Sequence, residues 1–433
     1  MKQHHILHWA AAFCVMAAVE ATAASFSMEG AVQAALMGNR DIAAARFAVK
    51  KAEGRLRQSG LLPNPEVEFN GYNGFVDGSG DEGLFTVGLH QMLPLTARLS
   101  IAREVSRVGV AEALREVRNE ERLLIARVQE LYIRTQAARR READGRNARM
   151  EAAKSATLAA ERIAAGQGSL SESALARVEE QTWTLQSTMA ATDAERSLLE
   201  LKTALGLSAD APLELTQSLE SAVDSLRQRA VESRASYRPD VELALLALDR
   251  AGAETRLAAA SAWEGIRVGV EYMQDNSVDA PAGVDTGNFL GVKVSLPLPV
   301  WDTRKGEVEA NKAAEEQRAA QVRALELDVA NGIAAARRRV SLIEQQSNVY
   351  GRDTQPVIDE AERDMAKGFE EGRVDARDLL FVRAQNASLR IESTKILEDL
   401  ALSLIELEST SGTHPAVAAP YLEEKPPHRR NEP

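Results

Sequence analysis

The side chains most able to do chemistry are few in this chain and lie far apart. After residue 24 the histidines are His90, His414 and His428, and the one cysteine is Cys14. A metal site needs several such ligands at close spacing, and no cluster of that kind occurs. The sequence also lacks a glycine-rich phosphate loop and a nucleophile elbow. We therefore expect no catalytic residue, no cofactor and no metal site, and the chain is not expected to be an enzyme.

A second set of polar residues lies in segments where polar and apolar residues alternate at a spacing of two. This alternation predicts β-strands with one apolar and one polar face. Four strands are predicted, at 66–75, 85–93, 266–272 and 290–298, with loops at 77–83 and 274–288 between the members of each pair. The polar faces carry Glu68, His90, Arg267, Glu271 and Lys293.

The elements that position these strands are helices, and one of them is unusually long. Residues 98–165 contain no proline and are rich in Ala, Leu, Val, Arg and Glu, which favour a helix. At about 1.5 Å per residue this helix would reach roughly 100 Å, so it must lie against others of similar length. Further helices are predicted at 28–61, 170–205, 239–263, 303–367 and 375–407, with a bend at Pro356.

The order of these elements occurs twice. Each half reads helix, strand, loop, strand, very long helix, turn, helix, and Leu93-Pro94 at one strand end matches Leu298-Pro299 at another. We therefore divide the chain into a first repeat at 25–212 and a second at 213–412. The tail at 413–433 contains five prolines and is expected to be disordered.

The amino terminus indicates secretion. Lys2 precedes an apolar run at 6–19, and the small residues at 21–24 suit cleavage, so residues 1–24 are predicted to be a signal peptide. The apolar run is too short for a comfortable membrane span. The net charge of −12 argues against a nucleic-acid surface.

The strands are about ten residues long and have an almost wholly apolar face, which suits a tilted crossing of a bilayer. A soluble β-sandwich gives the same alternation, but it does not normally carry helices of roughly 100 Å. Four strands cannot close a barrel, since open edges in lipid leave backbone groups unsatisfied, whereas three copies would supply twelve strands. The residues expected to face lipid are Val87, Leu89, Val292 and Val294, and those expected at its interfaces are Tyr72, Phe75, Phe85, Tyr272 and Phe289.

From about Ser27 to Gly412 the chain resembles the TolC-like outer-membrane efflux proteins. The resemblance rests on the repeat, on Leu-Leu-Pro-Asn-Pro-Glu at 61–66, on Leu-Pro-Leu-Pro-Val-Trp-Asp at 296–302, and on a glycine turn before a Leu/Gln-spaced helix in both halves. The proline motifs look most like the CzcC-type branch, which works in heavy-metal cation efflux.

The resemblance implies an α+β membrane protein in which a long α-helical coiled barrel is continuous with a transmembrane β-barrel of four strands per chain and twelve per trimer. It implies a homotrimer in the outer membrane with a large periplasmic portion. Its partners would be a periplasmic adaptor (a membrane fusion protein) and an inner-membrane pump of the RND type. The polar set of strand residues would then line the barrel lumen.

The two helical turns are the candidate docking sites. They contain Gly166, Gly168, Ser169 and Leu170 in the first half and Gly368, Gly372, Arg373 and Val374 in the second. Reversal of a helix explains the glycines fully. An apolar residue after each turn, Leu170 or Val374, suits contact with a helical hairpin, and the resemblance implies that the turns dock the adaptor.

Acids just after the second turn are the candidate pore constriction. Asp378 matches the first gate acid of the family, but Phe381 occupies the second gate position and Ala174 is the first-half counterpart. Asp375 and Glu172 are near enough to serve instead. The alternative is that Asp378 is an ordinary capping or surface acid.

These features predict a passive exit duct that does no chemistry and exports substrates delivered by its pump. Metal cations are favoured by resemblance only, and drugs or organic solutes stay open. One alternative is a periplasmic coiled-coil adaptor, which should show a single helical hairpin between lipoyl-like β segments. Another is a coiled-coil scaffold, which would not need strands with a continuous apolar face.

Overall fold

The computed structural model describes residues 24–74, 79–166, 168–232, 238–279, 283–371 and 373–412. Residues 1–23 of the predicted signal peptide, Phe75 and the predicted tail at 413–433 lie outside the described residues. The chain forms two compact units. Unit 1 comprises Met1–Ala43, Arg118–Arg238 and Asp328–Pro433, and unit 2 comprises Ala44–Val117 and Pro239–Leu327.

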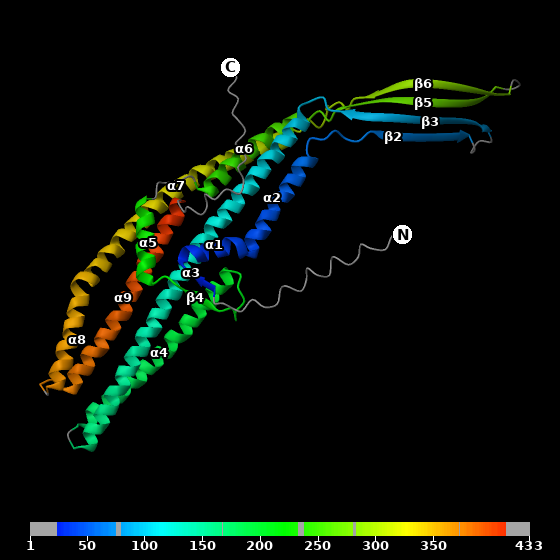
Figure 1. The fold of residues 1–433 in the computed structure, drawn as a ribbon. Coiled ribbons are helices and arrows are strands. Elements are labelled where there is room, and N and C mark those ends of the chain that lie inside the picture. Colours follow the sequence, from blue (N-terminus) through cyan, green and yellow to red (C-terminus); the bar gives the residue numbers. More distant parts are fainter. Residues whose placement is uncertain are drawn as a thin grey trace, which may run out of the picture. The chain divides into compact units, whose positions relative to one another are not determined.

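Unit 2 contains an antiparallel sheet of four strands in the order β2-β3-β5-β6. The strands are β2 (Glu66–Gly74), β3 (Ser79–Leu93), β5 (Ile266–Asp279) and β6 (Gly283–Ser295). Four helices join the same end of this sheet: α2 (Arg40–Gln58) and α6 (Pro239–Ala260) lead into β2 and β5, while β3 and β6 lead into α3 (Arg98–Ala164) and α7 (Lys305–Val349) (Figure 1). We call this the helix-proximal end of the sheet.

All four predicted strands are present, but the loops predicted at 77–83 and 274–288 are wrong. The strands continue through most of both segments, and Asn276 pairs with Thr286 where a loop was expected. Pairing with the neighbouring strand satisfies the backbone hydrogen-bonding groups of these polar segments, although their local composition favours turns. The strand predicted at 290–298 ends earlier, at Ser295, because Pro297 and Pro299 cannot donate to a ladder.

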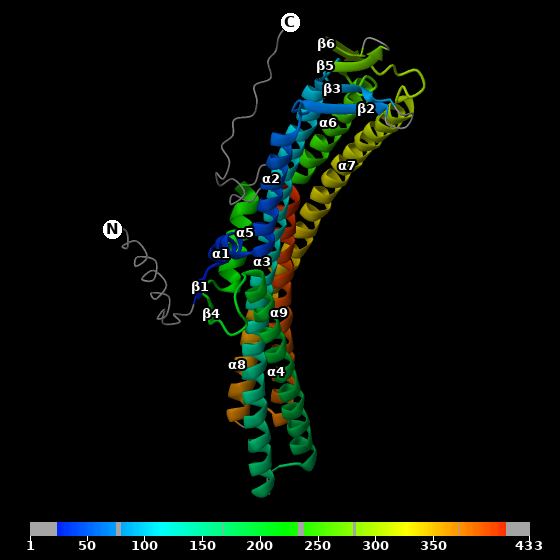
Figure 2. The same ribbon diagram turned by 90° about the vertical axis from the view of Figure 1, so that its right-hand side faces the viewer.

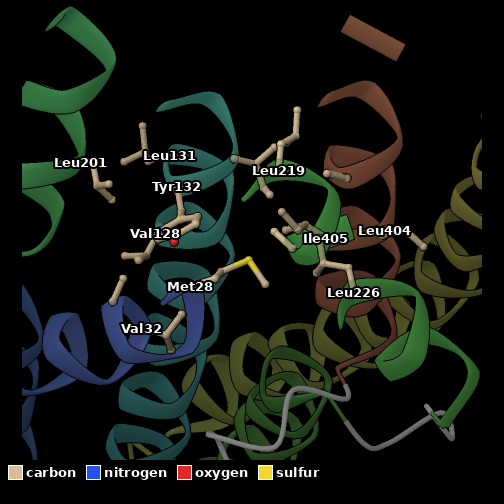
Figure 3. Close-up of a cluster of buried hydrophobic side chains, with 14 of the residues drawn as sticks. Met28, Val32, Val128, Leu131, Tyr132, Leu201, Leu219, Leu226, Leu404 and Ile405 are labelled. Carbon is tan, nitrogen blue, oxygen red and sulfur yellow. The ribbon is translucent and has the colours of Figure 1, made fainter. Parts of the chain in front are cut away.

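Unit 1 is mainly helical. It contains α1 (Met28–Gly38), the longer part of α3, α4 (Leu170–Ala204), α5 (Leu219–Glu232), α8 (Gln355–Glu370) and α9 (Ala376–Ser411), together with a short parallel pair of β1 (Ala24–Phe26) and β4 (Leu213–Leu215). Its core gathers side chains from α1, α3, α4, α5, α9 and the carboxyl-terminal part of α7. Figure 3 shows part of this cluster, including Met28, Val32, Val128, Tyr132, Leu201, Leu226 and Ile405. None of the described helices is both long enough and apolar enough to cross a membrane.

The helix predicted at 28–61 is in fact two helices, α1 and α2. Asn39 separates them, and its Oδ1 accepts hydrogen bonds from the backbone N–H of Asp41 at 2.9 Å and of Ile42 at 3.2 Å. Asparagine is a favoured residue at a helix start because its side chain satisfies such free N–H groups. These two side-chain hydrogen bonds begin a new helix after Asn39, although the apolar residues keep a helical spacing through this position.

Three further elements were not predicted from the sequence. β1 and β4 have three residues each, too few to show a period. α5 was missed although Leu219, Val223 and Leu226 have helical spacing and all three are buried in the core. These residues belong to the same buried cluster as Tyr132 and Ile405, so tertiary burial stabilises a short helix.

The second long helix is interrupted near the proline. α7 ends at Val349, a π-helical turn covers Tyr350–Thr354, and Pro356 lies in the first turn of α8. Proline has no N–H to donate and its ring crowds the preceding turn, and a wider π-helical turn accommodates both effects. The long helix predicted at 303–367 therefore consists of two α-helices joined by a π turn.

The order helix, strand, strand, long helix, helix occurs twice, as α2-β2-β3-α3-α4 and as α6-β5-β6-α7-α8-α9. Each compact unit takes segments from both halves of the chain. The repeat boundaries at 25–212 and 213–412 stay a prediction, because the compact units follow packing and not sequence order.

Candidate functional sites: the sheet faces and the helical turns

The register of the sheet decides which side chains share a face. One row across the four strands reads Glu66, His90, Gly269 and Lys293, and the neighbouring row on the same face reads Glu68, Gly88, Glu271 and Gly291. Arg267 and Met92 form the next row. The five polar residues singled out from the sequence therefore stand on one face, which we call the polar face.

His90 is buried on the polar face because glycines lie beside it. A Cβ atom at Gly88 would come within 2.6 Å of His90 Nε2, and one at Gly269 would clash with His90 Nδ1. The imidazole is 3% exposed, and its Nδ1 has no hydrogen-bond partner among the described residues. Sequence reasoning placed His90 on this face but missed the two glycines, whose signal was their position within otherwise regular strands.

Glu68 links side chains from three strands. Its carboxylate lies 3.0 Å from His90 Nε2 and 3.6 Å from Lys293 Nζ, and it accepts a hydrogen bond of 3.0 Å from Asn70. Lys293 also lies 4.0 Å from Glu271. The polar face thus presents a connected network of both charges. Such a surface suits water and passing ions, and it offers no activated nucleophile.

The opposite face of the sheet is apolar and open. Gln91 stands on this face beside Val268, and its apolar residues are Val67, Phe69, Phe85, Val87, Leu89, Val268, Val270, Tyr272, Leu290, Val292 and Val294. Most of these side chains are strongly exposed, and we call this surface the apolar face. A continuous apolar surface of this kind indicates an apolar partner, either protein or lipid.

The aromatic residues expected at membrane interfaces divide between the two faces. Phe85 and Tyr272 stand on the apolar face, whereas Tyr72 and Phe289 fall on the polar face with Glu68 and Lys293. The period of two fixes this, because Tyr72 lies an even number of residues from Glu68. The expectation for Tyr72 and Phe289 is therefore wrong, and Phe75 lies outside the described residues.

The first helical turn joins α3 to α4. Gly166 has φ +72°, a conformation that glycine adopts without strain. Ser169 begins α4 through a capping box, in which its hydroxyl accepts from Ser171 N–H and its own N–H donates to Glu172 Oε2 at 3.2 Å. Gly168 lies against the end of α3, and Leu170 is 80% exposed.

The second helical turn joins α8 to α9. Gly368, predicted to break the helix, lies within the last turn of α8, and its carbonyl accepts from the N–H groups of Arg373 at 2.8 Å and Val374 at 3.1 Å. A Cβ atom at Gly368 would come within 2.5 Å of Val374 Cγ2, so Val374 packs back onto the turn. Arg373 forms an ion pair with Glu371, and Gly372 lies outside the described residues.

The three acids predicted for a constriction have different surroundings. Glu172 is engaged in the capping box, whereas Asp375 and Asp378 are exposed at the start of α9. Phe381, at the position where the resemblance led us to expect a second gate acid, is 70% exposed. Both helical turns lie at the same end of unit 1, where α3, α4, α8 and α9 run side by side (Figures 1 and 2).

A charged groove between the α3–α4 and α8–α9 hairpins was not predicted. It is lined by Asp144, Glu151, Glu179, Trp183, Glu362, Arg383 and Arg390, and we call it the hairpin groove. Burial raises the pKa of Asp144 and of Glu179 above the ordinary carboxyl values. The groove arginines are shared with other acids, since Arg390 pairs with Glu362 at 2.9 Å and Arg383 with Glu151 at 3.5 Å. The residues of the hairpin groove come from four helices, so no local sequence motif predicts it.

The described residues contain no group of three or more His, Cys, Asp or Glu side chains placed to hold a metal ion.

Residues 31–207 match the sequence model of the outer membrane efflux protein family. A comparison with curated proteins found no match.

Solved outer-membrane channels share the fold. The channel CusC is 15% identical with a TM-score of 0.71, over 90% of this chain and 93% of that protein. MtrE of Neisseria gonorrhoeae is 18% identical with a TM-score of 0.70, over 89% of each chain. CmeC of Campylobacter jejuni is 16% identical with a TM-score of 0.69, over 89% of this chain and 85% of that one. The predicted likeness to outer-membrane efflux proteins is thus confirmed for the fold and for the family match at 31–207.

Proposed function

We propose that this protein is the outer-membrane exit channel of a tripartite efflux system. The observation that carries the proposal is the four-stranded sheet, which has one exposed apolar face and one charged face. Water on both sides of the sheet would leave the apolar face unfavourably exposed, whereas lipid on one side and water on the other suits both faces.

The sheet has two open edges in a single copy. β2 and β6 each have one neighbour within the described sheet, so each would leave a row of backbone groups unpaired in lipid. Three copies in which β6 of one pairs with β2 of the next would close a ring of twelve strands. The polar face then lines the lumen, with Glu68, His90, Arg267, Glu271 and Lys293 toward water.

The helices of the three copies would continue this ring as an α-helical barrel in the periplasm. The turns after α3 and α8 form its free end and receive the periplasmic adaptor. Leu170 is the best candidate contact because its side chain is exposed, while Val374 is half-buried against Gly368. The exposed Asp375 and Asp378 are the candidate constriction acids, since Glu172 is held by its cap.

The finer assignments rest on sequence resemblance. The Pro-Asn-Pro and Pro-Leu-Pro-Val-Trp-Asp motifs favour the CzcC-type branch, so an RND-type pump and heavy-metal cations are proposed as partner and substrate. The channel itself does no chemistry, and the pump supplies the energy. An adaptor would be expected to have one helical hairpin, whereas the described part of this chain has two, α3–α4 and α8–α9, in addition to its sheet.

Cell fractionation tests this proposal. The protein should be found in the outer membrane as a detergent-resistant trimer. Val292→Arg places a charge on the apolar face and should cost about 2–4 kcal/mol if that position is near the bilayer midplane. Gly291→Arg, on the polar face of the same strand and opposite Glu271, is the matched control and should leave the trimer in the membrane. A soluble monomer, or equal behaviour of the two variants, would contradict the proposal.

A further inference from the structure

Two tryptophans flank the helix-proximal end of the sheet, where the strands themselves carry no aromatic side chain. Trp263 precedes β5 by three residues and Trp301 follows β6 by six. The Trp263 side chain is 40% exposed and the Trp301 side chain is 95% exposed. A bare indole is unusual in water, because burial of so large an apolar surface is favourable.

The segment that carries Trp301 is held in a defined conformation. Val300 N–H donates to Leu298 O at 2.8 Å, and Arg304 N–H donates to Asp302 Oδ1 at 2.9 Å. Arg304 has φ +53°, a conformation that a residue with a side chain rarely adopts. Two prolines, Pro297 and Pro299, further restrict the backbone. These local bonds and restrictions hold the backbone on both sides of Trp301.

The apolar face continues along the chain to this tryptophan. Leu290, Val292 and Val294 stand on the apolar face, and Leu296 and Leu298 continue the same alternation beyond the strand. All five side chains are exposed. Immediately after Trp301 the sequence becomes charged, with Asp302, Arg304 and Lys305. Trp301 thus lies where the chain changes from apolar to charged.

The distance along the sheet fits a lipid layer. The other aromatic level of the apolar face is at Phe85 and Tyr272, and Tyr272 pairs with Leu290. From residue 290 to residue 298, at about 3.3 Å per residue and a tilt of about 40°, the height is roughly 20 Å. This is close to the apolar band of about 25 Å that aromatic girdles flank in outer-membrane proteins. Beyond Tyr272 the same face carries Gln274 and Asn276, which are polar.

We propose that Trp301, together with Trp263, anchors the helix-proximal end of the sheet in the headgroup region of the bilayer. This inference rests on the proposed function, because it requires the apolar face to be in lipid. The indole ring would lie against the acyl chains and its N–H would donate to a headgroup oxygen. The exposed Lys305 would face lipid phosphates. The occupant of this surface is therefore phospholipid and not a second copy of the chain.

Fluorescence quenching by brominated lipids tests the proposal on the full mature protein. The protein would be reconstituted into phosphatidylcholine vesicles brominated either near the headgroup or deep in the acyl chains. Trp301 emission would be obtained as the difference between wild type and Trp301→Phe, so that no other tryptophan need be removed. Headgroup-proximal bromine should quench most of this emission, and deep bromine should quench less of it.

Val292→Trp in a Trp301→Phe background provides a matched reporter on the apolar face, and deep bromine should quench it most. If this reporter is quenched but Trp301 is not, the anchor proposal is overturned and the channel proposal stands. Unquenched emission at long wavelength would place Trp301 in water, and unquenched emission at short wavelength would place it against another copy. If neither tryptophan is quenched, the membrane location of the sheet fails as well.

Discussion

At the scale of single residues, glycine decides how the polar face is built. His90 reaches its buried position only because Gly88 and Gly269 leave room for the ring. The ring then lies beside Glu68, which in turn contacts Lys293. This geometry makes the two glycines part of the candidate lumen although neither carries a functional group.

Gly88→Ala should destabilise the protein, because its Cβ would lie 2.6 Å from His90 Nε2. Crowding of this kind typically costs about 1–3 kcal/mol. Gly71→Ala is the matched control in β2, since a Cβ there meets nothing within 4 Å. The measurement is the temperature at which the trimer dissociates. The double variant Gly88→Ala/His90→Ala should recover part of the loss, and no recovery would contradict the role given to His90.

Leu170 offers a second test at this scale. Leu170→Asp should abolish cross-linking to the cognate adaptor, because it places a charge where an exposed apolar side chain is proposed to dock. Leu170→Met keeps an apolar side chain and should preserve cross-linking. Trimer abundance must be unchanged in both variants, since Leu170 lies outside the buried core. Full cross-linking by the Asp variant would rule out this contact.

At the scale of elements, the long helices meet through a charged groove in addition to apolar packing. A small apolar cluster lies between the α3–α4 and α8–α9 hairpins, nearer the helical turns than the main core. It consists of Ala156, Ala159 and Ala176, with Leu380 packed against them. Asp144 interacts electrostatically with Arg140 and Arg390, and Glu179 with Arg383. Arg383 also pairs with Glu151. Arg390 also pairs with Asp359 and Glu362. The packing of the two hairpins is therefore sensitive to charge.

Hairpin packing should strengthen as the pH falls from neutral. Burial raises the pKa of Asp144 and Glu179, so the packed state binds more protons than the separated state between the ordinary and the raised pKa values. This stabilisation of the packed hairpins is lost as the pH rises through the raised pKa values of the packed state. It is complete below the ordinary pKa values, 3.8 for Asp144 and 4.5 for Glu179. Hydrogen exchange of α8 and α9 across this range measures it. Asp144→Asn/Glu179→Gln should flatten the profile, and an unaltered profile would refute the assignment.

The sequence predicted the elements that have a strong period and missed those that depend on context. The helix from Arg98 and the two faces of the sheet followed directly from spacing, because each period was sustained. The extended ends of β5 and β6 were missed, since polar residues such as Asn276 are held there by the partner strand. The hairpin groove was missed for the same reason, as its residues come together only through tertiary packing.

At the scale of the whole molecule, the account depends on how the open edges of the sheet are satisfied. β2 and β6 are separated by β3 and β5 within one copy, so they cannot pair with each other in the same chain. Closure by three copies would satisfy both edges and would give the polar face a water-filled interior.

Disulfide cross-linking of neighbouring copies tests this central claim most directly. After residue 24 the chain has no cysteine, so Phe69→Cys in β2 can be combined in turn with Leu290→Cys, Val292→Cys or Val294→Cys in β6. Within one copy these positions are three strands apart, well beyond the roughly 7 Å limit between Cα atoms for a disulfide. The account predicts that at least one pair gives a covalent trimer in oxidised outer membranes, with each single-cysteine variant remaining monomeric on the same denaturing gel. Monomer alone for every pair would contradict it.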